Sequence, residues 1–381
     1  MVKERGRADL RVRSLNIQEA LTLTERERFH ATMRFGNPDR PPYRELPPWP
    51  ETIDRWRTEG YPKRADFRAW FGFDRYESVG IDDEINPVFR EELIEETPED
   101  IIKRDWRGVK VKLSKSSRSI PFFYGFPVTD RASFREFAKR LNAESPPRYP
   151  LFRDLRATEL AKRDYAVYFG SGRTIGFFGP IREWVGVEAL LLGFYDDPAW
   201  IHEMMDFYAD FIIRLTTPLL RDVTPDSIHF FEYMAYRGGP LISPEFFRSF
   251  MMAPYRRVLD HFRAHGVPFF VVDSDGNVDK LIPLFLELGI HAMYPFEVQA
   301  GMDILAVRKT YGRDLVIWGG LDKRKLALTK RDIEEEVYAK LPPMLEQGGY
   351  IPALDHEAPP DISFEHFCHY RRLVREICER G

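Results

Sequence analysis

The sequence predicts an α/β protein built as a (β/α)8 barrel of the TIM type, with an N-terminal helical extension. In its second half, short apolar runs alternate with segments of helical periodicity at intervals of about 20 to 40 residues, a pattern typical of right-handed β-α-β units and a parallel sheet. The runs are nearly continuous in apolar residues, as expected for strands covered on both faces. Five consecutive units and two earlier strands favour a closed barrel, with an open doubly wound sheet as the alternative.

Each expected strand ends where apolar side chains give way to glycine or to acidic residues. The expected strands are 165–171, 174–179, 227–233, 268–274, 291–298, 314–320 and 349–356. Helical segments lie between them. One of these is expected to be capped by Ser243, to start at Pro244 and to end before Gly266, with a kink or a break at Pro254.

The first 150 residues carry a weaker pattern. We expect helices over 16–36 and 50–60 and a hairpin over 109–125. Prolines are concentrated within 41–50, which indicates a cap around the first strands and not a separate module. The chain is therefore expected to form a single domain, 1–381, with 1–40 as its N-terminal extension.

Composition narrows the class of protein. The 381 residues include 56 Lys and Arg against 60 Asp and Glu, so the formal charge of -4 gives no reason to expect nucleic acid or an anionic membrane as a partner. Cys368 and Cys378 lie ten apart on an expected helix and face different sides of it, which predicts neither a disulfide nor a sulfur-rich metal site. Without an apolar run of membrane-spanning length or an apolar secretion signal, a soluble cytoplasmic protein is expected.

Acidic residues follow the expected strands, at the end where parallel barrels bind their ligands. These residues, with one histidine, are Glu232, Asp273, Asp275, Glu297, Asp322, Asp355 and His356. Carboxylates that converge on one mouth repel each other unless a cation, a protonated substrate or nearby arginines offset their charge. This concentration is the strongest functional signal in the sequence.

Structural roles are the alternative for several of these residues. Asp275 could form a turn with Gly276, whose positive φ the turn needs, and Asp322 could cap a helix. His356 could bond backbone carbonyls. For Glu297 a functional role is favoured over a structural one, because an acid in an apolar strand is costly to bury without a partner.

Two motifs are suggested by the stretch that begins at Asp273, and neither fits well. A calcium-binding EF-hand needs a glutamate at its twelfth position, where this chain has Leu284. A phosphatase of the haloacid dehalogenase type would use the first aspartate as a nucleophile, but Asn277 stands where such enzymes usually have Thr or Val.

Six segments carry a resemblance to a known superfamily. They are "RERFHATMRFGNPDRPPY", "FFEYMAYRGGPLISPEFFRSFMMAPY", "VVDSDGNVDKLIPLFLELGI", "PFEVQAGMDI", "WGGLDKRKLA" and "GGYIPALDHEAPPDISFEHF". On these segments the chain resembles the uroporphyrinogen decarboxylase superfamily, which includes corrinoid-linked methyltransferases, as a divergent member nearer the methyltransferase branch. The resemblance implies a (β/α)8 barrel. Where the decarboxylases bind substrate carboxylates with a block of arginines, this chain has 43–48 with Arg44; the methyltransferases' zinc-binding His-x-Cys-Gly matches 273–276, and their later Cys matches the Asp355–His356 pair.

The resemblance implies methyl transfer between a small substrate and a corrinoid (cobalamin) held by a partner protein. The expected catalytic residues are Asp273, Glu297 and His356, and with Asp275 they form an oxygen and nitrogen set that could bind zinc or another divalent cation. Alternatively, the same groups could bind a cationic or hydroxylated substrate directly. The residues expected to bind substrate are Glu232, Tyr233, Tyr236, Arg237 and Asp322. The alternative is a carboxy-lyase for an aromatic or pyrrolic carboxylic acid, which predicts an arginine-lined mouth and no metal requirement. A third hypothesis is a barrel that binds its ligand without turnover.

Overall fold

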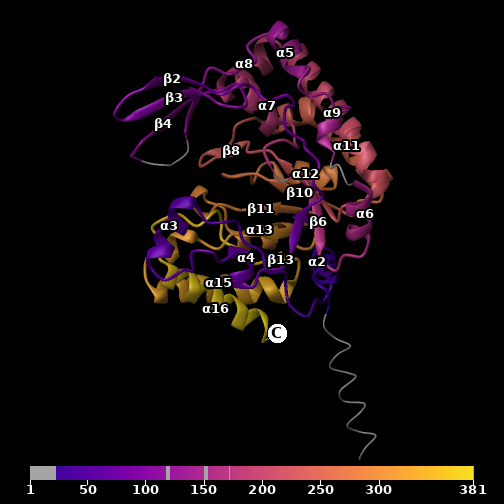
Figure 1. Ribbon diagram of the computed structural model, residues 1–381. Helices are drawn as coiled ribbons and strands as arrows, with labels where there is room; N and C mark the ends of the chain where they lie inside the picture. The colour runs from indigo at the N-terminus through magenta and orange to yellow at the C-terminus, as the bar shows by residue number, and fades with distance from the viewer. Residues whose placement is uncertain (1–22, 117–120, 150–152, 171, 381) are drawn as a thin grey trace, which may run out of the picture.

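The computed structural model describes residues 23–116, 121–149, 153–170 and 172–380 (Figure 1). Its central feature is a curled sheet of seven parallel strands, hydrogen-bonded in chain order. The strands are β1 (Tyr76–Ser78), β6 (Ala166–Phe169), β7 (Ser227–Phe231), β10 (Phe269–Asp273), β11 (Ala292–Tyr294), β12 (Val316–Trp318) and β13 (Tyr350–Ile351). The predicted fold class, an α/β barrel, is confirmed.

The segment 43–49 lies between the two edge strands, β13 and β1, in the place of an eighth strand. The Tyr43 carbonyl accepts a hydrogen bond from the Asp74 amide at 3.0 Å, just before β1. The Glu45 carboxylate accepts one from the Leu354 amide at 2.9 Å, just after β13. This proline-rich segment thus connects both edges of the sheet.

Helices cover the outer face of the sheet (Figure 1). Those that follow strands are α7 (Phe178–Val185), α8 (Val187–Asp196), α9 (Pro198–Asp222), α10 (Pro244–Phe246), α11 (Met252–Ala264), α12 (Ile282–Leu288), α13 (Ile304–Tyr311), α14 (Lys323–Leu326), α15 (Lys330–Gln347) and α16 (Phe364–Cys378). Before β6 lie α3 (Pro50–Thr58), α4 (Phe67–Phe71), α5 (Arg131–Ala138) and α6 (Arg153–Ala161). Within the described part of the chain, no helix is long and apolar enough to cross a membrane.

Helix α2 (Glu25–Met33) packs against the barrel interior at the amino ends of the strands. Phe29 of this helix meets Phe269, the first residue of β10, edge to face at 5.9 Å between ring centroids. Thr24 caps the helix through a capping box with Glu27. The helix expected over 16–36 therefore exists over a shorter range, while residues 1–22 of the expected extension lie outside the described residues.

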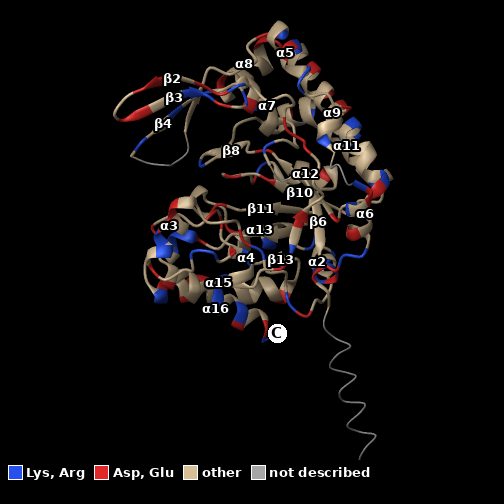
Figure 2. Ribbon diagram, in the orientation of Figure 1, with Lys and Arg blue, Asp and Glu red and all other residues tan. Residues whose placement is uncertain are grey.

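A four-stranded antiparallel sheet projects from the barrel (Figure 1). Its strands are β2 (Glu92–Glu96), β3 (Asp100–Arg104), β4 (Lys110–Ser114) and β5 (Phe122–Tyr124). The expected hairpin over 109–125 is the β4–β5 pair, although 117–120 lie outside the described residues. Acidic β2 lies beside the basic residues of β3 (Figure 2). Lys103 of β3 pairs with Glu91, just before β2, at 2.6 Å.

Two expectations for individual elements are corrected. The stretch 174–179 is not a strand, because Glu232 binds the backbone N–H groups there and turns them into the start of α7. The helix from Pro244 does break, but before Pro254: a π-helical segment, Phe247–Met251, separates α10 from α11. Pro254 has no N–H to give the Phe250 carbonyl, which removes the α-helical hydrogen bond at this point.

Candidate active site

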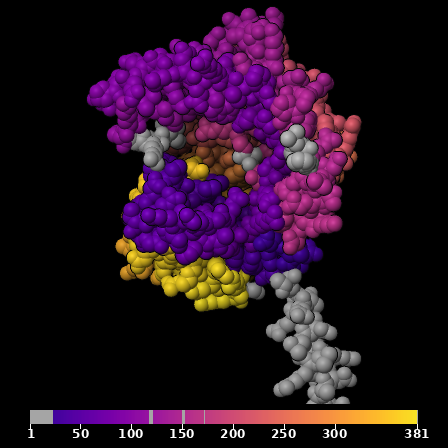
Figure 3. Space-filling model, viewed as in Figure 1, coloured from indigo at the N-terminus to yellow at the C-terminus, as the bar shows by residue number. Residues whose placement is uncertain are grey.

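A cavity of about 680 Å³ opens at the carboxyl ends of the strands. Figure 3 shows it as a hollow in the middle of this face, with chain from the first and last parts of the sequence around it. The residues that line it and enter the argument below are Tyr43, Arg44, Arg68, Tyr76, Tyr168, Arg173, His229, Tyr233, Asp273, Asp275, Tyr294, Trp318 and His356. Three of the acids and bases predicted from the sequence, Asp273, Asp275 and His356, therefore share one cavity.

Asp273 is the last residue of β10 and points into the barrel. In register with it are Phe231 of β7 and Tyr294 of β11, which also line the cavity. Burial and, to a smaller extent, the nearby charge of Asp275 together raise the pKa of Asp273 to about 8, although the hydrogen bond with Tyr294 lowers it. Asp273 is therefore protonated at neutral pH.

Asp275 and His356 face each other across the cavity mouth, with His356 Nε2 and Asp275 Oδ2 3.5 Å apart. Burial alone would lower the pKa of His356, but the hydrogen bond and the charge of Asp275 outweigh it and raise this pKa. Gly276 makes the turn possible, because it has a φ of +80° and an added Cβ would lie 2.5 Å from the Ala235 backbone.

Glu297 and Asp355 hold the loops behind the mouth and are not among the residues that line the cavity. Glu297 accepts a hydrogen bond from the Gly276 amide at 3.0 Å. Lys323 Nζ lies 3.8 Å from Glu297 and 3.5 Å from Asp355, which is fully buried. These contacts join the loops after β10, β11, β12 and β13, so Glu297 has a structural partner of the kind its burial requires.

The predicted metal ligands do not assemble. Among the described residues, no three His, Cys, Asp or Glu side chains gather closely enough to hold a metal ion. Glu297 is engaged by Lys323 and by the Gly276 amide, and this leaves Asp273, Asp275 and His356 without the fourth expected ligand. The donor set of Asp273, Asp275, Glu297 and His356 thus does not fit a metal as arranged.

Glu232 lies outside the cavity lining, contrary to expectation, because it comes one position after Phe231 and faces the opposite side of β7. Its carboxylate accepts hydrogen bonds from the amides of Phe177 and Phe178, each at 2.8 Å, and from Tyr255. Burial raises the pKa of Glu232 to about 7. This residue anchors the start of α7.

Of the other residues expected to bind substrate, only Tyr233 lines the cavity. Its φ of +34° is rare for a residue with a side chain, and Arg182 holds its carbonyl at 2.7 Å. Tyr236 and Arg237 are exposed on the loop around β8 (Ala235–Tyr236). Asp322 caps α14 and pairs with Arg324 at 2.7 Å.

Tyr76, His229 and Tyr294 form a hydrogen-bonded layer of aromatic side chains on the cavity wall beside Asp273, which we call the floor of the cavity. The Tyr76 hydroxyl contacts Ser227 Oγ at 2.7 Å and His229 Nε2 at 2.5 Å, while His229 Nδ1 is 3.5 Å from the Tyr294 hydroxyl. Burial, with a smaller contribution from the charge of Arg44, lowers the pKa of His229 to about 3. The floor is therefore polar but uncharged at neutral pH.

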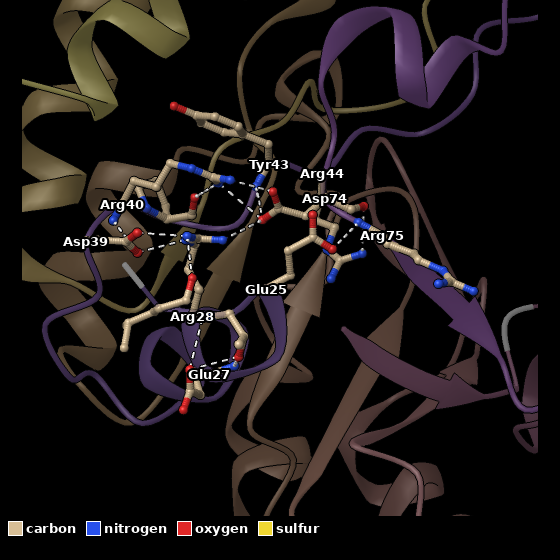
Figure 4. Close-up of polar contacts among 12 residues, drawn as sticks. Glu25, Glu27, Arg28, Asp39, Arg40, Tyr43, Arg44, Asp74 and Arg75 are labelled. Atoms are coloured by element: carbon tan, nitrogen blue, oxygen red, sulfur yellow. Dashed lines mark hydrogen bonds and ion pairs between the residues drawn. The ribbon is translucent and has the colours of Figure 1, made fainter. Parts of the chain in front are cut away.

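Arg44 supplies a buried positive charge at the cavity wall. In the neighbouring polar cluster, Asp39 and Asp74 are bound by Arg28 and Arg40, with Arg40 Nη2 2.6 Å from Asp74 (Figure 4). Arg44 itself stacks on the Tyr76 ring at 3.8 Å. Within the described structure its Nε and Nη2 have no hydrogen-bond partner, and no carboxylate lies within ion-pair distance of it. Burial lowers the pKa of Arg44 to about 10, which keeps it charged at neutral pH.

The aromatic residues of the floor were not predicted, because the candidate residues were sought only where the expected strands end. His229 has a signal of its own, a histidine inside the apolar run of β7, at an alternate position to Phe231. Tyr76 belongs to a three-residue strand with the sequence Tyr-Glu-Ser, which carries too little pattern to be recognised. Arg44 was indicated only by the family resemblance.

A parallel barrel with an acid, an imidazole and a buried arginine around a cavity at its carboxyl face has the architecture of an enzyme. The model of the uroporphyrinogen decarboxylase family matches residues 183–377, just over half of the chain. The chain therefore belongs to the uroporphyrinogen decarboxylase family.

The individual relatives are distant. Over 227 residues the chain is 25% identical to a uroporphyrinogen decarboxylase of Magnetococcus marinus, a match that spans 57% of this chain and 55% of that protein. The chain thus matches about half the length of this relative. A methyltransferase from Methanosarcina mazei has a similar fold, with a TM-score of 0.56 at 15% identity over 93% of this chain and 99% of that one. These values mark the chain as a divergent member of its family.

Proposed function

We propose that the cavity removes a carboxyl group from an aromatic or pyrrolic carboxylic acid. The observation that carries this proposal is Arg44, a buried cation on the cavity wall that forms no ion pair with a described carboxylate and feels Asp74 and Glu25 only from a greater distance. An unpaired buried charge is costly, and an anionic ligand recovers that cost. Arg68 and Arg173 also line the cavity, which matches the arginine-lined mouth expected of a carboxy-lyase.

The rest of the cavity suits a planar ring. Trp318 and Tyr294 lie with their ring centroids 5.1 Å apart, and Tyr76 lies 4.4 Å from Tyr168. Such a floor offers apolar area to a ring, while the hydroxyls and His229 give it hydrogen-bonding groups. A ring that carries two carboxylates could rest here with one of them at Arg44.

The reaction needs one proton, and Asp273 is placed to give it. When the bond between the ring carbon and the carboxylate breaks, its electron pair stays on the ring and carbon dioxide leaves. Asp273, protonated because burial raises its pKa, donates a proton to that carbon and a C–H bond forms. His356 at the mouth, held by Asp275, then returns a proton from solvent.

Methyl transfer to a corrinoid on a partner protein is the second candidate. The observation in its favour is the same protonated Asp273, since a methyl group that leaves an oxygen or nitrogen atom exposes a base that must be protonated. When bound, the corrinoid would take up the methyl group, and on this chain Asp273 or His356 would supply the proton. Zinc would have supplied the activation of a thiol or a hydroxyl, but the donor set described above does not favour it.

A product assay separates the two candidates. The purified protein is incubated with pyrrole- and benzene-dicarboxylic acids labelled with ¹³C in the carboxyl groups, and the released carbon dioxide is followed by NMR. In parallel, methoxylated and methylaminated aromatics are supplied with reduced cobalamin, and its absorbance spectrum is recorded. We expect labelled carbon dioxide, and we expect Arg44→Met to reduce its release at least about 100-fold, which corresponds to loss of a charge-assisted contact of about 3 kcal/mol.

Two control variants accompany Arg44→Met. Arg44→Lys keeps the charge and should retain part of the activity. Arg248→Met removes an exposed arginine that pairs with Glu287 and does not line the cavity, so it should leave the activity unchanged. If methylated cobalamin forms and no carbon dioxide is released, decarboxylation is refuted and methyl transfer is supported. Full carbon dioxide release by Arg44→Met would refute the role of Arg44.

A further inference from the structure

A second concave site lies outside the barrel, between α4 and α16. This groove has a volume of about 470 Å³ and is lined by Trp70, Phe71, Cys368, Arg371, Arg372, Arg375, Glu376 and Glu379. None of these residues lines the barrel cavity. In Figure 1 the two helices lie near each other on the lower part of the molecule, and an added Cβ on Gly72, which ends α4, would meet Arg375 at 3.5 Å. The groove is thus separate from the candidate active site.

The groove contains a buried cation, Arg371, for which the described residues provide no ion pair. Arg371 is 2% exposed, and its Nε and Nη1 have no hydrogen-bond partner among the described residues. Its guanidinium stacks on the Phe73 ring at 4.2 Å and donates one hydrogen bond, from Nη2 to the Phe71 carbonyl at 3.4 Å. Within the described chain no carboxylate lies within ion-pair distance of Arg371. Glu45 acts on it from farther away, but burial raises the pKa of Glu45 to about 7 and so weakens its charge at neutral pH, and a bound anion would offset the remaining charge of Arg371.

Two more arginines can reach the same ligand. Arg375 and Arg372 are half exposed or more, and their ion pairs are long, at 3.4 Å to Glu379 and 3.8 Å to Glu376. Exposed pairs of this length contribute little free energy, so a stronger anion can replace the glutamates. Arg372 Nη2 also lies 2.8 Å from His369 Nδ1. With three arginines against two glutamates the groove is net positive. Arginine is the side chain best suited to phosphate, which it binds with two N–H groups at once.

An aromatic surface completes the groove. Trp70 is 51% exposed, and its ring makes an edge-to-face contact with the Tyr61 ring, with 6.0 Å between the ring centroids. A large aromatic side chain fixed in position but open to solvent is typical of a surface that stacks on a planar ligand. The volume is that of a site for a small organic molecule and exceeds what a lone anion needs.

We propose that this groove binds a phosphorylated aromatic molecule of the size of a mononucleotide. The phosphate lies against Arg371 and Arg375, and the ring stacks on Trp70. This proposal is independent of the reaction in the barrel cavity, because it involves other residues and makes no use of turnover.

Isothermal titration calorimetry on the full chain tests this proposal, with AMP and UMP as complete ligands, adenosine as the ring alone and inorganic phosphate as the anion alone. Both nucleotides should bind with a dissociation constant below about 1 mM, and adenosine and phosphate should each bind at least about tenfold more weakly, since each lacks one of the two contacts. Arg375→Gln and Trp70→Leu should each weaken AMP binding by about tenfold, as expected for loss of one exposed charge or one stacking contact.

Arg331→Gln is the matched control, since Arg331 is an exposed arginine of α15 that pairs with Glu335 at 2.9 Å, and it should leave AMP binding unchanged. Arg375 and Trp70 are both at least half exposed, so their variants are expected to fold, which circular dichroism verifies. The proposal is overturned if neither nucleotide binds below about 1 mM, or if both groove variants bind AMP as the wild type does.

Discussion

The direction of each side chain at the end of its strand decides its role. Asp273 and Phe231 are paired in register and face the interior, so the acid that follows Phe231, Glu232, faces outward to α7. The sequence could identify both acids, but the register that separates them depends on pairing between strands far apart in the chain. Asp273, Asp275 and His356 were predictable for the same cavity, and the helix cap expected as the alternative for Asp322 is confirmed. The partner of Glu297 was not predictable, because Lys323 carries no pattern that reveals this contact.

Asp273 should act as an acid whose proton is lost in alkaline solution. Because its pKa is raised to about 8, the protonated form dominates at neutral pH, and the rate of carbon dioxide release should fall as pH rises through about 8. Asp273→Asn keeps the shape but cannot give up a proton, so the rate at pH 7 should fall by about 100-fold or more. A pH–rate profile and the variant's rate are measured together.

The control for this variant is Asp279→Asn, an exposed aspartate in the loop that follows β10. It should leave both the rate and the profile unchanged. An Asp273→Asn protein with the full rate would show that the proton comes from elsewhere, and His356 would be the next residue to examine.

Helix ends were well predicted wherever a local signal exists. The helix that begins at Pro244 after its Ser243 cap and ends before Gly266 was expected, and so was an interruption linked to Pro254. The form of that interruption, a π-helical turn at Phe247–Met251, was not predicted; its first residue, Phe247, packs between Tyr255 and Phe285. Such packing comes from the assembled molecule and leaves no periodic signal.

The attachment of α2 to the barrel should depend on one buried carboxylate. Asp226, just before β7, is 1% exposed and binds Arg26 at 2.8 Å, His30 at 2.7 Å and Arg163 at 3.1 Å. Burial would raise the pKa of Asp226, but the hydrogen bonds of His30, the Val167 amide and Arg26 outweigh it and lower this pKa from 3.8 to about 2. The stabilisation is therefore present above pH 4 or so and is lost as pH falls through about 2.

Asp226→Asn should reduce the free energy of unfolding by about 2 kcal/mol at pH 7, the value that corresponds to this pKa shift. Urea denaturation followed by circular dichroism measures it. Asp260→Asn, which removes an exposed carboxylate paired with Arg263, should change the stability by less than about 0.5 kcal/mol. Equal stabilities of the two variants would show that the three cations find other partners.

At the scale of the molecule, the barrel and its cavity depend on contacts between the two ends of the chain. The segment 43–49 bridges β1 and β13 and brings Arg44 to the cavity wall, across more than 300 residues of sequence from Leu354. Periodicity predicted the barrel because the strands from β6 onward carry a local pattern, although β1 does not. It did not predict the bridge, because a proline-rich stretch without a strand pattern gives no sign of what it will pair with.

The central claim is that a substrate carboxylate binds to Arg44 with its ring on the aromatic floor beside Asp273. A crystal structure of the protein with pyrrole-2,5-dicarboxylate tests it most directly. We expect one carboxylate within hydrogen-bonding distance of the Arg44 guanidinium and the ring beside Trp318, with the second carboxylate near Asp273. An Arg44 turned away to a protein carboxylate, with the dicarboxylate bound elsewhere or at the mouth alone, would contradict the account.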